Sequence, residues 1–356
     1  MRQGSLAIMK TTAFEESASS RFAANQGSGP VTPAAHAVDH VPSGDLAVAG
    51  LAVARPQTRH SRWADYQEIF KVRVTSMVVI TAWAGFYLGS MRSGITSMHR
   101  GLVEALLGVT LVSCGASALN QVIERKTDAK MVRTSQRPLA AGRFGVLQGM
   151  LLGLACFAAG ALVLAWYTNP VTVMLTLLTG FTYVAVYTPL KRYTTLATFI
   201  GAFPGAMPPL LGWTAARGVI EWPAVALFAI LFVWQFPHFM AIAWLYKDDY
   251  AKAGIRMLPV VQPDGWSTAC EALIYAVLMI PVSAIPFYLH LTGWVYLVTA
   301  LVLGVVYLAY TIRFARITRA LSTAESRGYA RDLLRASVIY LPILLTVMML
   351  NATGRR

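Results

Sequence analysis

Charged residues are scarce in this sequence. Only 13% of its 356 residues are Asp, Glu, Lys or Arg, whereas 56% are hydrophobic, and the mean hydropathy is +0.55. A soluble globular domain carries about 25% charged residues. Too few charges are therefore present to cover a water-facing surface of this size, and a simple soluble enzyme is not expected.

Cysteine is also rare, and its spacing excludes two common frameworks. The three cysteines are Cys114, Cys156 and Cys270, and each lies in an apolar stretch without a C-x-x-C pair. Neither a disulfide framework nor a zinc site is indicated. We interpret all three as packing residues.

The first 62 residues contain no long apolar run and no sustained periodicity. Ala, Ser, Gly, Thr and Pro dominate this stretch, which is typical of a disordered tail. Its apolar run from Leu6 to Met9 is too short for the core of a secretory signal peptide. Four acidic residues argue against a mitochondrial transit peptide: Glu15, Glu16, Asp39 and Asp45. We expect a disordered tail over residues 1–62 and one domain over residues 63–352.

Long apolar segments follow the tail, each close to the ~20 residues that cross a bilayer as a helix. They are Val72 to Ser90, Leu102 to Ile123, Val146 to Trp166, Val171 to Tyr187, Leu196 to Trp213, Pro223 to Tyr246, Cys270 to Leu289, Trp294 to Ile312 and Ala336 to Leu350. Lipid contains no water to satisfy free backbone groups, so these segments must be helices. The sequence therefore predicts an all-α polytopic membrane protein with nine transmembrane helices.

The distribution of basic residues predicts an orientation. The sequence has 30 Lys and Arg against 16 Asp and Glu, a formal net charge of +14. Of these 30, 17 lie in the loops after the second, fourth, sixth and eighth apolar segments. Basic loops mark the cytoplasmic side, so we expect a cytoplasmic N-terminus, an external C-terminus and no nucleic-acid partner. The acidic tail favours a bacterial cytoplasmic membrane, with the mitochondrial inner membrane as the alternative.

Three oxygen-bearing side chains recur at intervals of four at the end of the second apolar segment: Asn120, Glu124 and Asp128. On an α-helix each step of four turns the side chain by only about 40° net, so all three project from one face. Such hard oxygen ligands suit Mg²⁺, which completes its shell with water and substrate phosphates. Arg133 and Arg137 follow closely and would clamp a phosphate. The alternative interpretation is a solvated helix end held by ion pairs.

A second carboxylate pair, Asp248 and Asp249, follows the sixth apolar segment and again precedes basic residues. This repeated layout indicates an internal repeat whose two helix ends face each other. Lys191, after the fourth segment, would neutralise a leaving diphosphate, although the positive-inside bias also explains it. Together the two clusters predict a metal-bridged diphosphate site. A secondary transporter is the alternative from another class, but its charged site would lie near the midplane, whereas these carboxylates lie at cytoplasmic helix ends.

Three stretches resemble the UbiA-type intramembrane prenyltransferases: Asn120 to Pro138, Tyr187 to Arg192 and Trp234 to Pro259. The resemblance covers about residues 65 to 350 and includes the number of helices. The signature of these enzymes is N-x-x-x-D-x-x-x-D, and this sequence has Glu124 at the middle position. The third stretch is most similar to members that use haem, rather than a quinone precursor, as the acceptor.

The resemblance implies a UbiA-type bundle that transfers the farnesyl group of farnesyl diphosphate to the 2-vinyl group of haem b, giving haem O. It implies Mg²⁺ held by Asn120, Asp128, Asp248 and Asp249, with Glu124 and Lys191 completing the catalytic set. Residues implied in substrate binding are Arg133, Arg137, Tyr187, Trp234, His238, Tyr246 and Tyr250. An aromatic quinone precursor is the alternative acceptor. A haem A synthase or a terminal oxidase assembly factor is a candidate partner.

Three of these assignments have an ordinary structural alternative. Tyr187 and Trp234 would stabilise a farnesyl cation through their ring faces, but aromatic residues at helix ends are more often interface anchors. His238 lies inside the apolar sixth segment, where ionisable residues are functional candidates. We predict haem contact for His238. The alternative is a neutral histidine bonded to a carbonyl group that Pro237 frees.

Overall fold

The computed structural model describes residues 61–92 and 100–353, so the predicted tail lies outside the described residues except for its last two positions. The long helices are α2 (Val72–Arg92), α3 (Arg100–Asp128), α4 (Val146–Tyr167), α5 (Pro170–Phe181), α7 (Ala197–Arg217), α8 (Trp222–Leu245), α11 (Trp266–Tyr288), α12 (Trp294–Phe314) and α13 (Thr323–Leu350). Shorter elements are α1 (Arg62–Ile69), the π-helix η1 (Thr182–Tyr187), α6 (Thr188–Leu190), α9 (Lys247–Ala253), α10 (Leu258–Val261) and the 3₁₀-helix η2 (Ala315–Arg319). This part of the chain contains no strand, which confirms the all-α prediction.

Eight helical stretches in the described part are long and apolar enough to cross a membrane. They are α2, α3, α4, α5 continued through η1 and α6, α8, α11, α12 continued through η2, and α13. The one remaining predicted segment, Leu196 to Trp213, forms α7, in which prolines and glycines lower the hydropathy. Half of α7 is buried, and it packs against α2, α5 and α8. Because other helices surround it, α7 needs little apolar surface facing lipid.

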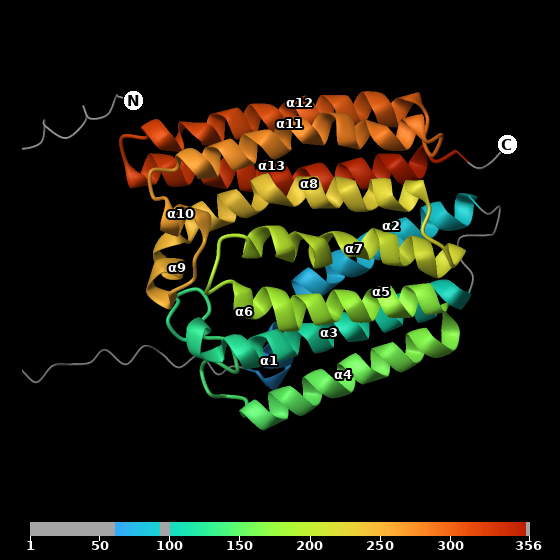
Figure 1. The fold of residues 1–356 in the computed structure, drawn as a ribbon, viewed down its shortest axis with the longest axis horizontal. Helices are drawn as coiled ribbons and strands as arrows, with labels where there is room; N and C mark the ends of the chain where they lie inside the picture. Colours follow the sequence, from blue (N-terminus) through green and yellow to red (C-terminus); the bar gives the residue numbers. More distant parts are fainter. Residues whose placement is uncertain (1–60, 93–99, 354–356) are drawn as a thin grey trace, which may run out of the picture. The chain divides into compact units, whose positions relative to one another are not determined.

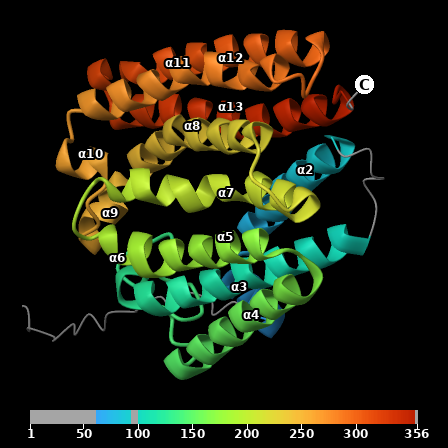
Figure 2. The ribbon, with the colours of Figure 1, turned by 45° about the vertical axis from the view of Figure 1, so that its right-hand side comes forward.

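The helices form three groups in Figure 1, with α3, α4 and α5 at one edge, α2, α7 and α8 in the middle, and α11, α12 and α13 at the other edge. The closest neighbours are α3 with α4, α2 with α7, and α8 with α11. Figure 2 shows α2 passing obliquely across α7. A cavity described below lies where the first and middle groups meet.

The connections rich in basic residues gather at one end of the bundle, on the left in Figure 1. This basic end comprises residues 129–145, 191–196, 246–265 and 315–322, together with α1. The sequence pattern predicts that these loops lie together, and the structure confirms that they lie at one end of the bundle. The predicted start of the last helix is wrong, because α13 begins at Thr323 rather than Ala336. Its first turns are polar, and Ser322 caps them by accepting from the Glu325 backbone N–H at 3.2 Å.

Two irregularities shape the helices that line the cavity. The π-helix η1 ends directly before α6, where Pro189 cannot donate a backbone hydrogen bond. The Thr188 hydroxyl donates instead to the Tyr183 carbonyl at 2.8 Å. In α7, Pro204 and Pro208 interrupt the hydrogen-bond ladder. Such π-bulges and proline breaks occur frequently at functional sites and at cavities between membrane helices.

Candidate active site

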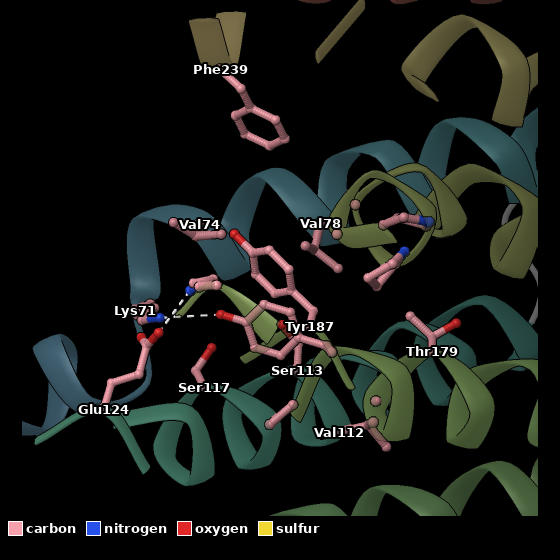
Figure 3. A pocket seen from close by; sticks show the side chains of 18 of the residues that line it. Lys71, Val74, Val78, Val112, Ser113, Ser117, Glu124, Thr179, Tyr187 and Phe239 are labelled. Atoms are coloured by element: carbon pink, nitrogen blue, oxygen red, sulfur yellow. Dashed lines mark hydrogen bonds and ion pairs between the residues drawn. The ribbon is translucent and has the colours of Figure 1, made fainter. Parts of the chain in front are cut away.

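A cavity of about 380 Å³ opens near the basic end and extends between α2, α3, α5 and α7. Its volume lies in the range of small-molecule sites, about 300–1,000 Å³. The polar residues that line it are mostly charged or aromatic: Lys71, Glu124, Asp128, Arg133, Arg137, Tyr183, Tyr187, Lys191 and Tyr250. Figure 3 shows Lys71 and Glu124 at one end of the cavity and Val78, Val112 and Thr179 further along it. The cavity therefore has a charged head and an apolar body.

The three side chains spaced by four lie on one buried face of α3, as the spacing predicts. Asn120, Glu124 and Asp128 are 0%, 9% and 1% exposed. Glu124 and Asp128 line the cavity directly. The amide of Asn120 donates to the Thr188 hydroxyl at 2.9 Å, which ties α3 to α6.

Each of these three side chains is paired with a basic residue. Lys71 Nζ lies 2.6 Å from Asn120 Oδ1. Lys191 Nζ lies 2.8 Å from Glu124 Oε1. Arg137 Nη1 lies 2.9 Å from Asp128 Oδ2. Because Asn120 is neutral, these three pairs together carry one net positive charge before any ligand binds.

Lys191 lies in a setting that keeps it charged. Burial works to lower the pKa of Lys191, but Tyr187 and the Glu124 carboxylate outweigh burial, so its pKa lies above that of an ordinary lysine. The ammonium group also lies 4.3 Å from the centre of the Tyr187 ring. Lys191 is therefore a permanent cation at the head of the cavity.

Arg133 connects the loop after α3 to helix α9 and to Tyr246, which precedes α9. Its guanidinium lies 4.8 Å from the ring centre of Tyr246 and donates to the Tyr250 hydroxyl at 3.4 Å. The backbone N–H of Arg133 donates to Asp249 Oδ2 at 3.3 Å. The loop after α3 and helix α9 thus meet at the head of the cavity, as the repeated layout predicts.

The two aspartates of the second cluster point in different directions. Asp249 contacts the loop after α3 through Arg133. Asp248 Oδ2 instead lies 3.0 Å from Arg327 Nη2 of α13, and its side chain is 60% exposed. Asp248 is absent from the described lining of the cavity. Of the two, only Asp249 contacts the loop after α3, and it too is absent from the described lining of the cavity.

The donor set fits Mg²⁺ in chemistry. Within residues 61–92 and 100–353, no three His, Cys, Asp or Glu side chains converge on one point. Mg²⁺ does not require such a cage, because it is typically held by one or two carboxylates together with waters and substrate phosphates. Glu124 and Asp128 offer hard oxygens in the cavity lining, and Asn120 and Asp249 offer theirs beside two lining residues, Lys71 and Arg133. The neighbouring basic residues supply the positive charge that a diphosphate requires.

Trp234 and His238 lie outside the described lining of this cavity. Their rings stack with centroids 4.9 Å apart. Trp234 Nε1 donates to the Ser337 carbonyl at 2.9 Å, and His238 Nδ1 lies 2.8 Å from Ser337 Oγ. Both therefore connect α8 to α13. The next residue, Phe239, does line the cavity and points toward it from α8 (Figure 3).

Comparison with known proteins identifies the group to which this chain is similar. The profile of the UbiA prenyltransferase family matches residues 78–331. The chain belongs to the UbiA prenyltransferase family. A relative from Koribacter versatilis, named protoheme IX farnesyltransferase, is 52% identical over 85% of this chain and 97% of its own length. A relative of the same name from Solibacter usitatus is 41% identical over 82% of this chain and 99% of its own length.

Solved structures share the fold of this prenyltransferase. One, described as a digeranylgeranylglyceryl phosphate synthase in membranes, superposes with a TM-score of 0.66 at 16% identity and covers 82% of this chain and 98% of that one. A UbiA homologue from Archaeoglobus fulgidus bound to GPP and Mg²⁺ gives a TM-score of 0.51 at 15% identity, covering 79% and 99%. Both the predicted resemblance and the predicted bundle are confirmed. The chain is an integral membrane protein and a transferase.

The sequence interpretation did not single out several residues that line the cavity, among them Lys71, Tyr183 and Phe239. Lys71 stands directly before α2, where a lysine is expected from charge bias alone. Its backbone has a φ of +47°, which is rare for a residue with a side chain. Its Nζ contacts both Asn120 and Tyr183. The sequence alone indicates neither this backbone conformation nor these two contacts.

Proposed function

We propose that this protein transfers the farnesyl group of farnesyl diphosphate to the 2-vinyl group of haem b, with Mg²⁺ as cofactor. Haem b, farnesyl diphosphate and water would give haem O and diphosphate. The relatives named protoheme IX farnesyltransferase, which match most of this chain, support the choice of both substrates. The prediction from the sequence agrees with these names.

The observation that carries the proposal is the division of one cavity into a charged head and an apolar body. A prenyl diphosphate has the same division. The basic side chains at the head (Lys71, Arg133, Arg137 and Lys191) match a diphosphate, and the valines and prolines of the body match a hydrocarbon. A transporter for a polar anion would need neither the apolar body nor an aromatic wall.

Binding of the diphosphate would require the basic side chains at the head of the cavity to exchange partners. Lys191, Lys71 and Arg137 would leave Glu124, Asn120 and Asp128 for the diphosphate oxygens. Bound Mg²⁺ would neutralise part of the diphosphate charge, held by the oxygens of Asn120, Glu124, Asp128 and Asp249. Because the cations are already in place, little reorganisation is needed when negative charge develops on the leaving group.

Ionisation of the allylic C–O bond would leave a farnesyl cation beside Tyr187. The ring face of Tyr187 would stabilise that cation, and the apolar body would keep water away from it. The vinyl π electrons of haem b would then attack the first farnesyl carbon and form the new C–C bond. Water would add to the resulting cation next to the porphyrin and lose a proton, giving the hydroxyl group of haem O.

The haem would approach the cavity from the α8 side. Phe239 faces the cavity from α8, and His238 and Trp234 precede it on the same helix. We place haem contact at His238, with Tyr246 and Tyr250 supporting the diphosphate end through Arg133. The alternative is a purely structural role, in which His238 only links α8 to Ser337 of α13.

We also propose the setting in which the enzyme works. The basic end would face the cytoplasm, with the N-terminus inside and the C-terminus outside, in the cytoplasmic membrane of a bacterium. Haem O would pass to a haem A synthase or a terminal oxidase assembly factor. Bacterial relatives support this membrane over the mitochondrial one.

Expression in a haem-replete host that lacks this activity tests the proposal. Extracted haems are separated by chromatography, and we expect haem O from the parent chain. The Asp128→Ala variant, expressed to the same level, should give none. Equal chromatograms from parent and variant, both without haem O, would overturn the proposed function.

A further inference from the structure

The apolar body of the cavity ends where α2 crosses α7. The two helices touch backbone to backbone there, at Gly85 with Pro209 and at Gly212 with Ala82. A Cβ added at either glycine would overlap the carbonyl oxygen of its partner. Below the cavity Ala82 and Leu164 are fully buried, so the space is filled. Backbone therefore closes the α2–α7 side of this end, and buried side chains such as Leu164 fill the space beyond it.

The distance from the charged head to this crossing is the same on both helices. Lys71 to Ala82 on α2 and Gly201 to Gly212 on α7 are each eleven residues apart. At 1.5 Å per residue both intervals measure about 17 Å. Both intervals begin near the charged head. The Tyr187 ring, which faces Lys191 at the head, also packs against Gly201, so Gly201 lies close to the depth of Lys71.

Prenyl groups of different length can be compared with this depth. An extended chain advances roughly 1.2 Å per bond, as a polypeptide does. A farnesyl main chain of about eleven C–C bonds then reaches about 13 Å, and a geranylgeranyl chain of about fifteen bonds reaches about 18 Å. The first leaves room for its terminal carbon above the crossing, and the second does not.

We propose that the crossing of α2 and α7 at Ala82 and Gly212 limits the prenyl donor to three isoprene units, and that Val78 is the residue that sets specificity just above it. This inference rests on the proposed prenyl transfer. Val78 lies one helical turn before Ala82, is half-buried and faces the cavity body (Figure 3). A larger side chain at this position would fill the space of the last isoprene unit.

The test is a competition among geranyl, farnesyl and geranylgeranyl diphosphates at equal concentration. Purified enzyme with haem b and Mg²⁺ receives the mixture, and mass spectrometry counts each product. The parent should use farnesyl at least about tenfold better than geranylgeranyl, since a filled pocket discriminates a methylene by 10-fold or more. Val78→Phe should shift the geranyl-to-farnesyl ratio at least about tenfold toward geranyl.

Three further variants sharpen the result. Val103→Phe makes the same change on α3 at a side that is 67% exposed, and it should match the parent. Val78→Ala should still reject geranylgeranyl, because the backbone floor stays in place. Val78→Leu replaces the Phe variant if thermal unfolding shows that the latter does not fold, and it should shift the ratio in the same direction.

A binding readout separates this inference from the proposed function. The rise in unfolding temperature caused by each diphosphate with Mg²⁺ is measured without haem, and it should be largest for farnesyl in the parent. Preferential binding of farnesyl diphosphate without prenylation of haem would support the inference and would contradict haem b as the acceptor. Prenylation of haem by farnesyl and geranylgeranyl diphosphates alike would overturn the inference and leave the function standing. An unchanged product ratio in folded Val78→Phe would overturn the role of Val78.

Discussion

Lys191 Nζ lies 2.8 Å from Glu124 Oε1, and this ion pair joins the end of α6 to the buried face of α3 at the head of the cavity. The side chains are only 13% and 12% exposed. Removing one partner of such a buried pair leaves an uncompensated charge and costs about 3–5 kcal/mol. The pair therefore links stability to the proposed diphosphate site.

Replacing Lys191 separates these two roles. Lys191→Met should lower both the unfolding temperature and kcat/KM for farnesyl diphosphate, the latter roughly 100-fold or more, because a charge aimed at the leaving group is lost. The double variant Lys191→Met with Glu124→Gln should regain stability but not activity. Thermal unfolding and steady-state kinetics measure the two effects. Recovery of activity in the double variant would contradict a role for Lys191 in the reaction.

Metal and diphosphate should bind in mutual dependence. Mg²⁺ must displace a cation of the chain from Asn120, Glu124 or Asp128, and a diphosphate gives that cation a new partner. Calorimetry should show Mg²⁺ binding at least about tenfold tighter with saturating inorganic diphosphate, and diphosphate binding tighter with Mg²⁺ by the same factor. Equal Mg²⁺ affinity with and without diphosphate would contradict the exchange of partners.

Asp249 should matter more than Asp248. The structure places Asp249 beside Arg133 and Asp248 beside Arg327, away from the cavity. Asp249→Asn should therefore lower turnover and weaken Mg²⁺ binding in the presence of diphosphate, and Asp248→Asn should do so far less. The two variants remove the same charge from adjacent positions and serve as each other's control. The reverse order of effects would place the metal on the other aspartate.

His238 should affect haem and not the prenyl donor. His238→Ala should raise KM for haem b while KM for farnesyl diphosphate stays within about twofold. Ser337→Ala is the matched control, because it breaks the same 2.8 Å contact without removing the imidazole. Kinetics with each substrate varied in turn give the answer. If both variants merely lower the unfolding temperature by similar amounts, the contact with Ser337 is the whole role of His238.

The sequence predicts the bundle well because lipid leaves helices as the stable way to satisfy the backbone, so apolar length alone finds the crossings. The face formed by Asn120, Glu124 and Asp128 is predictable for a similar reason, since helical periodicity fixes it. Helix ends such as Thr323 are not predictable in this way. The length of an apolar run marks the part of a helix that crosses the membrane, and not the residue at which its backbone hydrogen bonds begin. The separate directions of Asp248 and Asp249 depend on tertiary partners on α13 and the α3 loop, which local sequence does not contain. Lys71 is not predictable for the same reason, because its backbone conformation and its contacts with Asn120 and Tyr183 depend on tertiary structure.

The transfer reaction itself tests the account most directly. Purified protein receives haem b, farnesyl diphosphate and Mg²⁺, and mass spectrometry follows the haem, with an aromatic quinone precursor offered in a parallel reaction. The account predicts a haem product that has gained one farnesyl group and one hydroxyl group, with the hydroxyl oxygen labelled when the water is labelled, and no product in Asp128→Ala. Unmodified haem beside a prenylated aromatic acceptor would contradict the proposed acceptor.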